Sequence, residues 1–265
     1  MDDPRTLDAD RLPAQEIEEL KELERRNRDL GAREHTAGQY YGKRAFQLHA
    51  ESRTYLRYLA PRAGERVLDA GAGLGRLALL VAPRVGRLVC VDLSADALEV
   101  LRAETEAQGI RNVETVQGDL CRVPGTLGPF DRAYSVEVLQ HIPSDRERRA
   151  ALAKMHELLK PGGRCLIGVI CWNRRTRRRG AGKESFWGTG ERRLYAYAFT
   201  PQEIGRLLRE TGFLDVRVRG LMALPARITR RLPRWLGVVE TWCSTAPFLA
   251  RVSNFVIATG RRGSA

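Results

Sequence analysis

Residues 67–82 constrain the fold of this chain more than any other stretch. They read V-L-D-A-G-A-G-L-G-R-L-A-L-L-V-A: a short apolar run ending at Asp69, a turn with three glycines, and an apolar pattern with helical spacing. This order predicts a strand, a tight turn and a helix. Because glycine has no Cβ, Gly71 and Gly73 allow a sharp turn and let a ligand lie against bare main chain. We therefore expect a small molecule to bind here, next to the unpaired N–H groups of the helix N-terminus.

The acid before the glycines indicates what that molecule carries. The dinucleotide fingerprint G-x-G-x-x-G requires glycine where this chain has Arg76, so the match is incomplete. Asp69 stands two residues before Gly71, and a carboxylate there repels a pyrophosphate and attracts a cation. S-adenosylmethionine carries an ammonium and a sulfonium group. The sequence therefore favours it over a phosphate-linked cofactor.

The segment D-A-G-A-G-L-G resembles the first motif of the class I S-adenosylmethionine-dependent methyltransferases, in particular the small-molecule branch. The resemblance extends over residues 40–260. It implies an α/β fold, with a Rossmann-like, mostly parallel sheet of seven strands, helices on both faces and an antiparallel last strand beside the fifth. We expect residues 1–60 to form a tail and a helical cap, and residues 61–265 to form the methyltransferase domain with an insertion at 172–199.

Three acids end three successive predicted strands. Asp92 follows R-L-V-C-V, 23 residues after Asp69, and Asp119 follows N-V-E-T-V-Q-G, 27 residues later. A carboxylate at the position of Asp92 can accept hydrogen bonds from both ribose hydroxyls of a nucleoside cofactor. Asp92 can also cap the helix that begins near Ser94, and the two roles are compatible. The sequence thus predicts a carboxylate-rimmed site at the carboxyl edge of a parallel sheet.

The resemblance implies further contacts to the cofactor. Leu93 is expected to pack on the adenine face, Asp119 to accept from the adenine amine, and Leu120 to donate its backbone N–H to the ring. The backbone at Ser135 and Val136, within the F-D-R-A-Y-S-V strand, is expected to line the methionine end.

The segment Q-Y-Y-G-K-R-A-F lies ahead of the first strand, where relatives place an aromatic residue and an arginine over the cofactor. The resemblance assigns that place to Tyr40, Tyr41 and Arg44, with the arginine pairing with the methionine carboxylate. Simple packing of the two tyrosines is the alternative.

His141, in the sequence E-V-L-Q-H-I-P, is the candidate catalytic residue. A neutral imidazole can take a proton from a hydroxyl or ammonium nucleophile, which a methyl transfer to oxygen or nitrogen can require. Tyr41 is its possible partner. A structural role in the pocket wall is the alternative, because the His-hydrophobic-Pro sequence that ends this segment also occurs in relatives with different substrates.

Residues 172–199 break the regular alternation of strands and helices. They contain eight basic and two acidic residues, a net charge of +6, with Trp187, Tyr195 and Tyr197 among them. Long loops after a strand of an open α/β sheet carry substrate-binding excursions. The segment is expected to be a lid that recruits an anionic small molecule; RNA docking and a solvated loop are the alternatives.

Two other segments have open roles. A helix is predicted from Ala14, with Ile17, Leu20 and Leu30 on its apolar stripe and Gly31 as its end, and it can serve as a lid, a packing helix or a contact between two copies. Residues 221–247 mix apolar side chains with arginines. They can form part of an acceptor pocket, or a peripheral membrane face for a lipid or quinone acceptor.

Composition limits the remaining classes. The 265 residues suit one main domain, no apolar run approaches the ~20 residues that span a bilayer, and the acidic start lacks a signal sequence, which favours a cytoplasmic protein. Five cysteines without a C-x-x-C pair and four scattered histidines predict reduced thiols and no metal site. The net charge of +13 permits a nucleic-acid partner but does not require one. The sequence is interpreted as an S-adenosylmethionine-dependent methyltransferase acting on oxygen or nitrogen of a small molecule.

Overall fold

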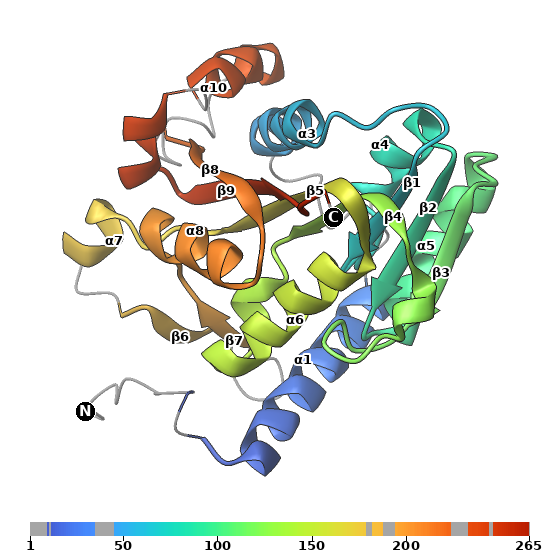
Figure 1. Ribbon diagram of the computed structural model, residues 1–265, viewed down its shortest axis with the longest axis horizontal. Coiled ribbons are helices and arrows are strands. Elements are labelled where there is room, and N and C mark those ends of the chain that lie inside the picture. The colour runs from blue at the N-terminus through green and yellow to red at the C-terminus, as the bar shows by residue number, and fades with distance from the viewer. Residues whose placement is uncertain are drawn as a thin grey trace.

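The computed structural model of the chain describes residues 10, 12–34, 45–178, 182–187, 194–223, 233–243 and 246–264. Its centre is a seven-stranded sheet in the order β3-β2-β1-β4-β5-β9-β8 (Figure 1). The strands are β1 (Arg66–Ala70), β2 (Arg87–Asp92), β3 (Val113–Gln117), β4 (Phe130–Val136), β5 (Leu159–Ile170), β8 (Leu214–Leu221) and β9 (Phe255–Arg261).

The direction of the strands agrees with the expectation from the sequence. Strands β3, β2, β1, β4 and β5 pair in parallel, and β9 pairs antiparallel with both β5 and β8. The last strand therefore inserts antiparallel beside the fifth, as predicted. Because the parallel strands share one direction, their carboxyl ends all meet at one edge.

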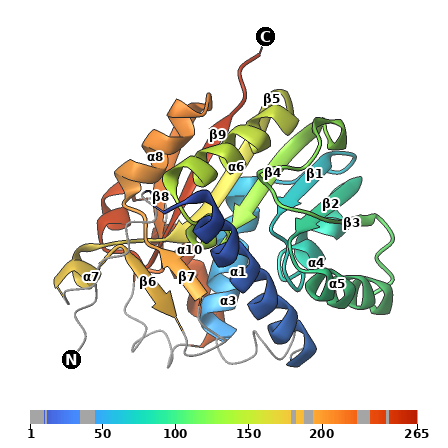
Figure 2. The ribbon, with the colours of Figure 1, turned by 90° about the horizontal axis from the view of Figure 1, so that it is seen from below.

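Helices cover both faces of the sheet, and alternate residues of each strand face opposite cores (Figure 2). Val67 and Leu88 pack with helices α3, α4 and α5, whereas Leu68 and Val89 pack with α6 and α8. Burial on both faces explains why these strands read as continuous apolar runs.

The helices are α1 (Ala14–Glu34), α3 (Ala45–Leu59), α4 (Ala78–Val81), α5 (Ala95–Ala107), α6 (Asp145–Leu158), α7 (Arg174–Arg178), α8 (Pro201–Glu210) and α10 (Gly237–Cys243). The 3-10 turns are η3 (Ala82–Arg84), η4 (Gly125–Leu127), η5 (Leu139–His141), η7 (Arg234–Leu236) and η8 (Pro247–Arg251).

The first helix differs from its prediction in length. α1 continues through Gly31 to Glu34, so the predicted end at Gly31 is wrong. Beyond the glycine, Ala32 is buried against Leu74 and Ala97, and Arg33 pairs with Asp96 at 2.6 Å. These tertiary contacts outweigh the intrinsic preference of glycine for a helix end.

Two segments whose sequences are not typical of strands, the K-P-G-G run and part of the basic insertion, form strands. The K-P-G-G sequence at 160–163 lies within β5, at an irregularity where the register against β4 shifts, and Gly162 there has φ +76°. Within the basic insertion, β6 (Glu184–Trp187) and β7 (Leu194–Tyr197) pair antiparallel as a second sheet. Strand β7 contacts η5 and α1, so this hairpin is packed against the body.

In the part of the chain that the structure describes, every helix is too short or too polar to cross a lipid bilayer. The C-terminal helix α10 packs on α3 and β8.

Candidate functional site

A cavity of about 250 Å³ lies at the carboxyl edge of the sheet, where β1, β2, β3 and β4 end. Its walls come from the glycine turn after β1, the ends of the next strands, the segment around η5, helix α1 and the β6–β7 hairpin. Of the residues predicted from the sequence, it brings together Asp69, Gly71, Gly73, Asp92, Leu93, Asp119, Leu120 and His141. The predicted site is thus one continuous space.

The glycine turn shapes the floor of this cavity. Gly71 has φ +97°, its N–H donates to the carbonyl oxygen of Val91 at 2.8 Å, and a Cβ there would lie 2.1 Å from Cγ2 of Val138. Gly73 has φ +52°, and a Cβ there would meet no atom within 4 Å. The space beside Gly73 is therefore open to a ligand, as the sequence predicted.

Asp69, the residue before the last of β1, lies in the wall of the cavity and is only 3% exposed. Its Oδ2 accepts a hydrogen bond from the Tyr134 hydroxyl at 2.7 Å. Burial raises the pKa of this carboxyl to about 7, although the hydrogen bond from Tyr134 opposes the shift. Asp69 therefore carries a full negative charge only above neutral pH, unless a bound cation stabilises its ionised form.

Asp92 ends β2 beside the glycine turn. Its Oδ2 accepts from the Gly73 N–H at 2.7 Å, and its Oδ1 accepts from the Ser94 N–H at 3.0 Å. Ser94 caps α5 with its own side chain, which accepts from the Ala97 N–H. The predicted helix-capping role thus falls to Ser94. Each oxygen of Asp92 keeps a second lone pair that can accept from a ligand hydroxyl.

Asp119, after β3, is bound by a lysine from the first helix. Nζ of Lys21 lies 2.9 Å from Oδ2 of Asp119 and also contacts the Glu147 carboxylate. Burial acts to lower the pKa of Lys21, but hydrogen bonds to the two carboxylates outweigh it and the net shift is upward. Asp119, Glu147 and Cys121 bring their ligand atoms within 4.8 Å of one another. The cation found among them is the lysine ammonium.

His141 is buried in the cavity wall at 8% exposure. Nδ1 lies 2.8 Å from the carbonyl oxygen of Tyr195, so Nδ1 carries the proton and donates it. Gln140 accepts from the Ile170 N–H with its Oε1, which turns its Nε2 toward Nε2 of His141 at 3.3 Å. Burial lowers the pKa of His141. The ring is therefore neutral at pH 7, with its basic lone pair on Nε2.

Comparison with known proteins agrees with this geometry. Residues 67–163, which span the glycine turn and all three acidic strand ends, match the family described as a methyltransferase domain. This chain carries a methyltransferase domain over residues 67–163. Its fold is shared by 1,6-didemethyltoxoflavin-N1-methyltransferase of Burkholderia thailandensis, with a TM-score of 0.60, 23% identity, and coverage of 99% of this chain and 93% of that one.

Two curated relatives match part of this chain in sequence. The ubiquinone/menaquinone biosynthesis C-methyltransferase UbiE of Coxiella burnetii is 36% identical over 40% of this chain and 43% of its own length. The ubiquinone biosynthesis O-methyltransferase of Xylella fastidiosa is 31% identical over 46% of this chain and 50% of its own. The chain therefore spans about half the length of these relatives.

Helix α1 lines the cavity of the methyltransferase domain with polar residues that the sequence analysis missed. Lys21, Glu24 and Arg28 recur at helical spacing and all face the cavity. The sequence analysis considered only the apolar stripe of this helix. Within that stripe the side chain of Ile17 is buried, whereas the side chain of Leu20 is partly exposed. The spacing of the charged residues was the available signal, but a charged stripe normally faces solvent.

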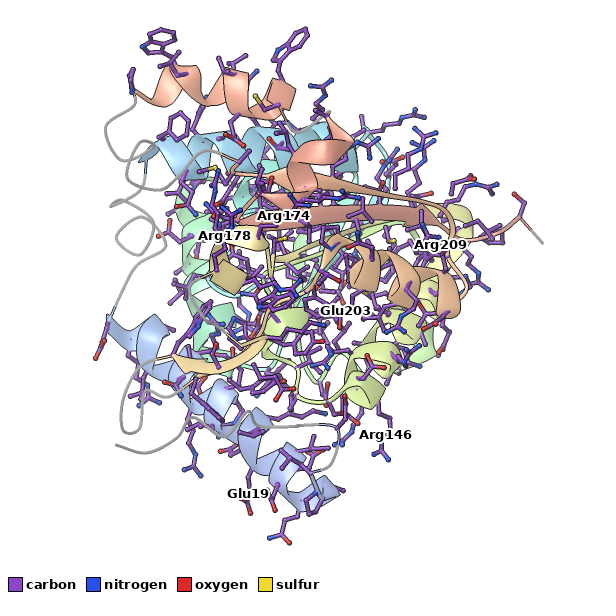
Figure 3. All side chains as sticks on the ribbon, turned by 90° about the vertical axis from the view of Figure 1, so that its left-hand side faces the viewer. Glu19, Arg146, Arg174, Arg178, Glu203 and Arg209 are labelled. Atoms are coloured by element: carbon purple, nitrogen blue, oxygen red, sulfur yellow. The ribbon has the colours of Figure 1, made fainter. Side chains whose placement is uncertain are left out.

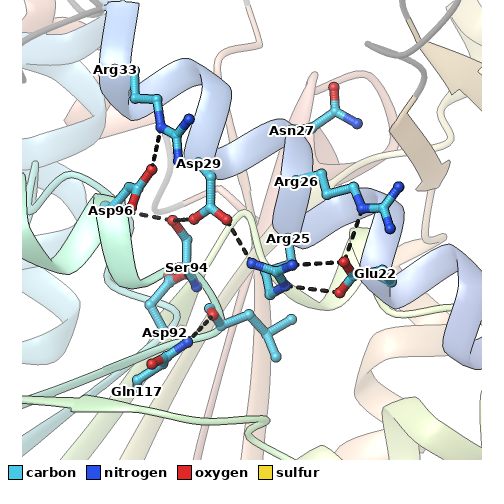
Figure 4. Close-up of polar contacts among 12 residues, drawn as sticks. Glu22, Arg25, Arg26, Asn27, Asp29, Arg33, Asp92, Ser94, Asp96 and Gln117 are labelled. Atoms are coloured by element: carbon cyan, nitrogen blue, oxygen red, sulfur yellow. Dashed lines mark hydrogen bonds and ion pairs between the residues drawn. The ribbon is translucent and has the colours of Figure 1, made fainter.

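The C-terminal half of α1 is fastened to the start of α5 (Figure 4). Oδ1 of Asp29 accepts from the Ser94 hydroxyl at 2.5 Å, and Nε of Arg33 lies 2.6 Å from Oδ2 of Asp96. Arg25 links Asp29 to Glu22 within the helix. Together with Lys21, these contacts hold α1 across the ends of β2 and β3 and support its predicted role as a cap.

Replacing Lys21 with methionine is expected to loosen α1. The change leaves the part-buried carboxylates of Asp119 and Glu147 without their shared cation, and breaking such a pair costs about 3 kcal/mol. Amide hydrogen exchange across 14–34 should become roughly 100-fold faster. Arg26→Met is the matched control, because Arg26 is exposed and pairs only within the helix, with Glu22. Equal exchange in the two variants would show that Lys21 does not anchor the helix.

Arg76 and Glu137 of the cavity were not predicted as site residues, whereas Trp187 belongs to the segment expected to form a lid. Arg76, noted only as the mismatch to the dinucleotide fingerprint, lies 3.2 Å from carboxylate oxygens of both Glu51 and Glu137. Glu137 adopts φ +61°, a strained conformation for a residue with a side chain. Trp187 of the hairpin also lines the cavity and meets His141 edge to face at 6.0 Å. Contacts of this kind depend on chain folding and leave no local pattern.

Other predicted site residues lie elsewhere. Ser135 is buried behind the cavity wall, where its hydroxyl donates to the carbonyl oxygen of Ala70 at 2.7 Å; the next residue, Val136, lines the cavity. Tyr40, Tyr41 and Arg44 lie outside the described residues. None of the described residues of 221–247 lines this cavity, which leaves the acceptor-pocket interpretation of that segment without support.

Proposed function

We propose that this chain transfers a methyl group from S-adenosylmethionine to an oxygen or nitrogen atom of a small-molecule acceptor and releases S-adenosylhomocysteine. The observation that carries the proposal is the meeting of Asp69, Asp92, Asp119 and the glycine turn around one cavity of about 250 Å³. When bound, S-adenosylmethionine supplies an electrophilic methyl carbon on sulfonium sulfur; the acceptor atom bonds to this carbon as the carbon–sulfur bond breaks.

The residues present fit this cofactor. Asp92 has a lone pair on each oxygen for the two ribose hydroxyls, and Leu93 and Leu120 offer apolar surface for the adenine. Asp119 accepts from the adenine amine beside Lys21, and Asp69 attracts the positive charge of the methionine end. A dinucleotide would bring a pyrophosphate against these carboxylates, which disfavours it.

In this proposal His141 is the general base. Its Nε2 exchanges the hydrogen bond from the Gln140 amide for the proton that the acceptor oxygen or nitrogen loses, and Nδ1–H stays on the carbonyl oxygen of Tyr195. Oε2 of Glu24 lies 3.9 Å from Nδ1, close enough to stabilise the imidazolium that forms. Because much of the rate of such a displacement comes from alignment of the three reacting atoms, the base adds to positioning and does not replace it.

Glu24 also suggests what the acceptor carries. Its Oε1 accepts from Nε of Arg28 at 2.7 Å, whereas its buried Oε2 meets no hydrogen-bond donor among the residues that the structure describes. An acceptor hydroxyl or amine can donate to this oxygen. The cationic side chains in the cavity, Arg28, Lys21 and Arg76, each pair with a carboxylate of this chain. These pairs give no support to the expectation that the acceptor is anionic.

Replacing His141 with alanine is expected to lower turnover about 100-fold, while the affinity for S-adenosylhomocysteine stays within twofold. Because the pKa of His141 lies below the ordinary value of 6.5, the wild-type rate should rise with pH to a plateau, with the midpoint of the rise below pH 6.5, and the variant should lose this rise. Initial rates between pH 5 and 8 measure both. His156→Ala is the control, since His156 packs on Phe213 away from the cavity. Turnover near the wild-type value would remove His141 as the base.

The test of the proposed function is a methyl-transfer screen with labelled cofactor. Metabolite extract, lipid extract and total RNA are offered in parallel, at 0.1 M and 0.5 M salt, and calorimetry compares S-adenosylhomocysteine with NAD. We expect label in a small molecule and heat from S-adenosylhomocysteine.

The β6–β7 hairpin supports this outcome, because its residues Trp187 and Leu194 line the cavity, whereas Arg174 and Arg178 of α7 (Figure 3) do not. Salt-sensitive labelling of RNA would identify a nucleic-acid enzyme instead, and binding without transfer would show a non-catalytic protein.

A further inference from the structure

Helix α10 and the turn before it are amphipathic, with the apolar side facing solvent. Trp235, Val238, Val239 and Trp242 are 67%, 37%, 52% and 69% exposed. Their spacing of three, four and seven residues places them on one side of a helix. We call these four residues the α10 apolar face. In Figure 3 bulky side chains of this helix, at the top of the view, project away from the rest of the molecule.

The polar side of the same helix is the buried one. Glu240 is 1% exposed and its Oε1 accepts from the Ala223 N–H at 2.7 Å. The hydroxyl of Thr241 lies 3.1 Å from that of Thr54 on α3. At Gly237 the helix approaches α3 so closely that a Cβ would lie 3.3 Å from the backbone nitrogen of Ala50. These contacts fix the rotation of α10, so the tryptophans cannot turn inward without loss of the buried hydrogen bonds.

Basic side chains are exposed on elements next to α10, whereas the acid of α10 itself, Glu240, is buried. On α3, which packs against α10, Arg53 and Arg57 are exposed, as is Arg251 after it. Tryptophan and arginine together are the residues that favour the interface of an anionic bilayer, where the rings enter the headgroup layer and the cations meet lipid phosphates.

A second copy of this chain fits the same surface less well. Each copy carries a net charge of +13, so a contact between two copies would bring two strongly basic molecules together. An anionic lipid surface supplies the opposite charge over the whole area. The charges around the α10 apolar face therefore favour the lipid surface.

We propose that the α10 apolar face is a docking surface for an anionic lipid bilayer, into whose headgroup layer Trp235 and Trp242 insert. The protein binds there peripherally, through one short helix and the arginines around it. This inference does not rest on the proposed methyl transfer, because docking needs neither cofactor nor acceptor.

Flotation of the full chain with lipid vesicles, without cofactor, tests the proposal. We expect binding to vesicles of phosphatidylglycerol and phosphatidylcholine, at least tenfold weaker binding to pure phosphatidylcholine, and quenching of tryptophan fluorescence by brominated lipid. The double variant Trp235→Ser/Trp242→Ser should lose at least tenfold in binding and most of the quenching. Leu214→Ser is the matched control, because Leu214 is 48% exposed on the edge strand β8.

Three results would overturn the proposal. The wild-type protein could fail to bind anionic vesicles. Alternatively, the double variant could bind them as tightly as the wild type, which would leave only nonspecific charge attraction. Sedimentation equilibrium could also show a dimer that the double substitution dissociates, which would assign the face to a second copy. Thermal unfolding of both variants confirms that they remain folded, as expected for exposed side chains.

Discussion

Asp69→Asn is expected to weaken binding of S-adenosylhomocysteine by about 10- to 100-fold and, at the same time, to raise the unfolding temperature of the free protein above pH 7. A hydrogen bond to a charged group is worth about 1.5–3 kcal/mol, and the variant loses the charge that, in the proposed function, attracts the cationic end of the ligand. Titration calorimetry at pH 8, where the wild-type carboxyl is ionised, measures the loss.

The gain in stability follows from the pKa of Asp69. Burial raises it to about 7 in the folded protein, whereas the unfolded chain has the ordinary value of 3.8. Between these values the folded state binds more protons than the unfolded state, so the free energy of unfolding falls as the pH rises. The loss reaches up to about 4 kcal/mol above pH 7. Asparagine cannot ionise, and its oxygen still accepts from Tyr134.

Thermal unfolding between pH 4 and 8 compares the stability of the wild type with that of Asp69→Asn. Wild type and Asp69→Asn should unfold alike near pH 4 and diverge as the pH rises. Asp131→Asn is the control, because Asp131 pairs with Lys160 at 2.7 Å outside the cavity and its loss should not stabilise the protein. A variant that is less stable than wild type at pH 8 and binds S-adenosylhomocysteine normally would refute both roles of Asp69.

Gly71→Ala is expected to cost about 3 kcal/mol of unfolding free energy or more and to abolish cofactor binding. A methyl group at φ +97° is strained, and it would lie 2.1 Å from Cγ2 of Val138. The clash displaces the segment after β4, which forms one wall of the cavity. Urea unfolding and calorimetry with S-adenosylhomocysteine measure the two effects.

Two further variants isolate the clash from the backbone strain. Gly109→Ala has φ +67° and open space around the new methyl group, so it should cost only about 1 kcal/mol and leave binding unchanged. Adding Val138→Ala to Gly71→Ala should restore part of the lost stability, since it removes the atoms that the new methyl group meets. If Gly71→Ala were no less stable than Gly109→Ala, close packing at Gly71 would not be required.

Local patterns were sufficient for the cofactor side of the domain. Acids after apolar runs marked Asp69, Asp92 and Asp119, and the glycines marked the turn, because strand ends and tight turns depend on residues that are neighbours in sequence. The same reasoning mistook the hairpin β6–β7 for a loop and ended α1 at Gly31. In both cases the outcome depends on contacts with distant elements, such as that of β7 with η5.

The acceptor side depended on tertiary structure. The sequence pointed to His141 but did not show that the carbonyl of Tyr195 and the amide of Gln140 fix its tautomer. It gave no sign that Lys21 would neutralise Asp119 from a helix 98 residues away.

By itself, the amino-acid sequence determined the succession of strands and helices and the acids at the strand ends, because apolar runs and strand-end residues act over a few positions. The parallel sheet was implied by the resemblance to the methyltransferases. Only the tertiary structure decided which helix covers that edge, that the pKa of Asp69 lies near 7, and that α10 turns its tryptophans outward. The physical reason is that burial and charge pairing depend on every group that surrounds a side chain, and folding brings those groups together from distant parts of the chain.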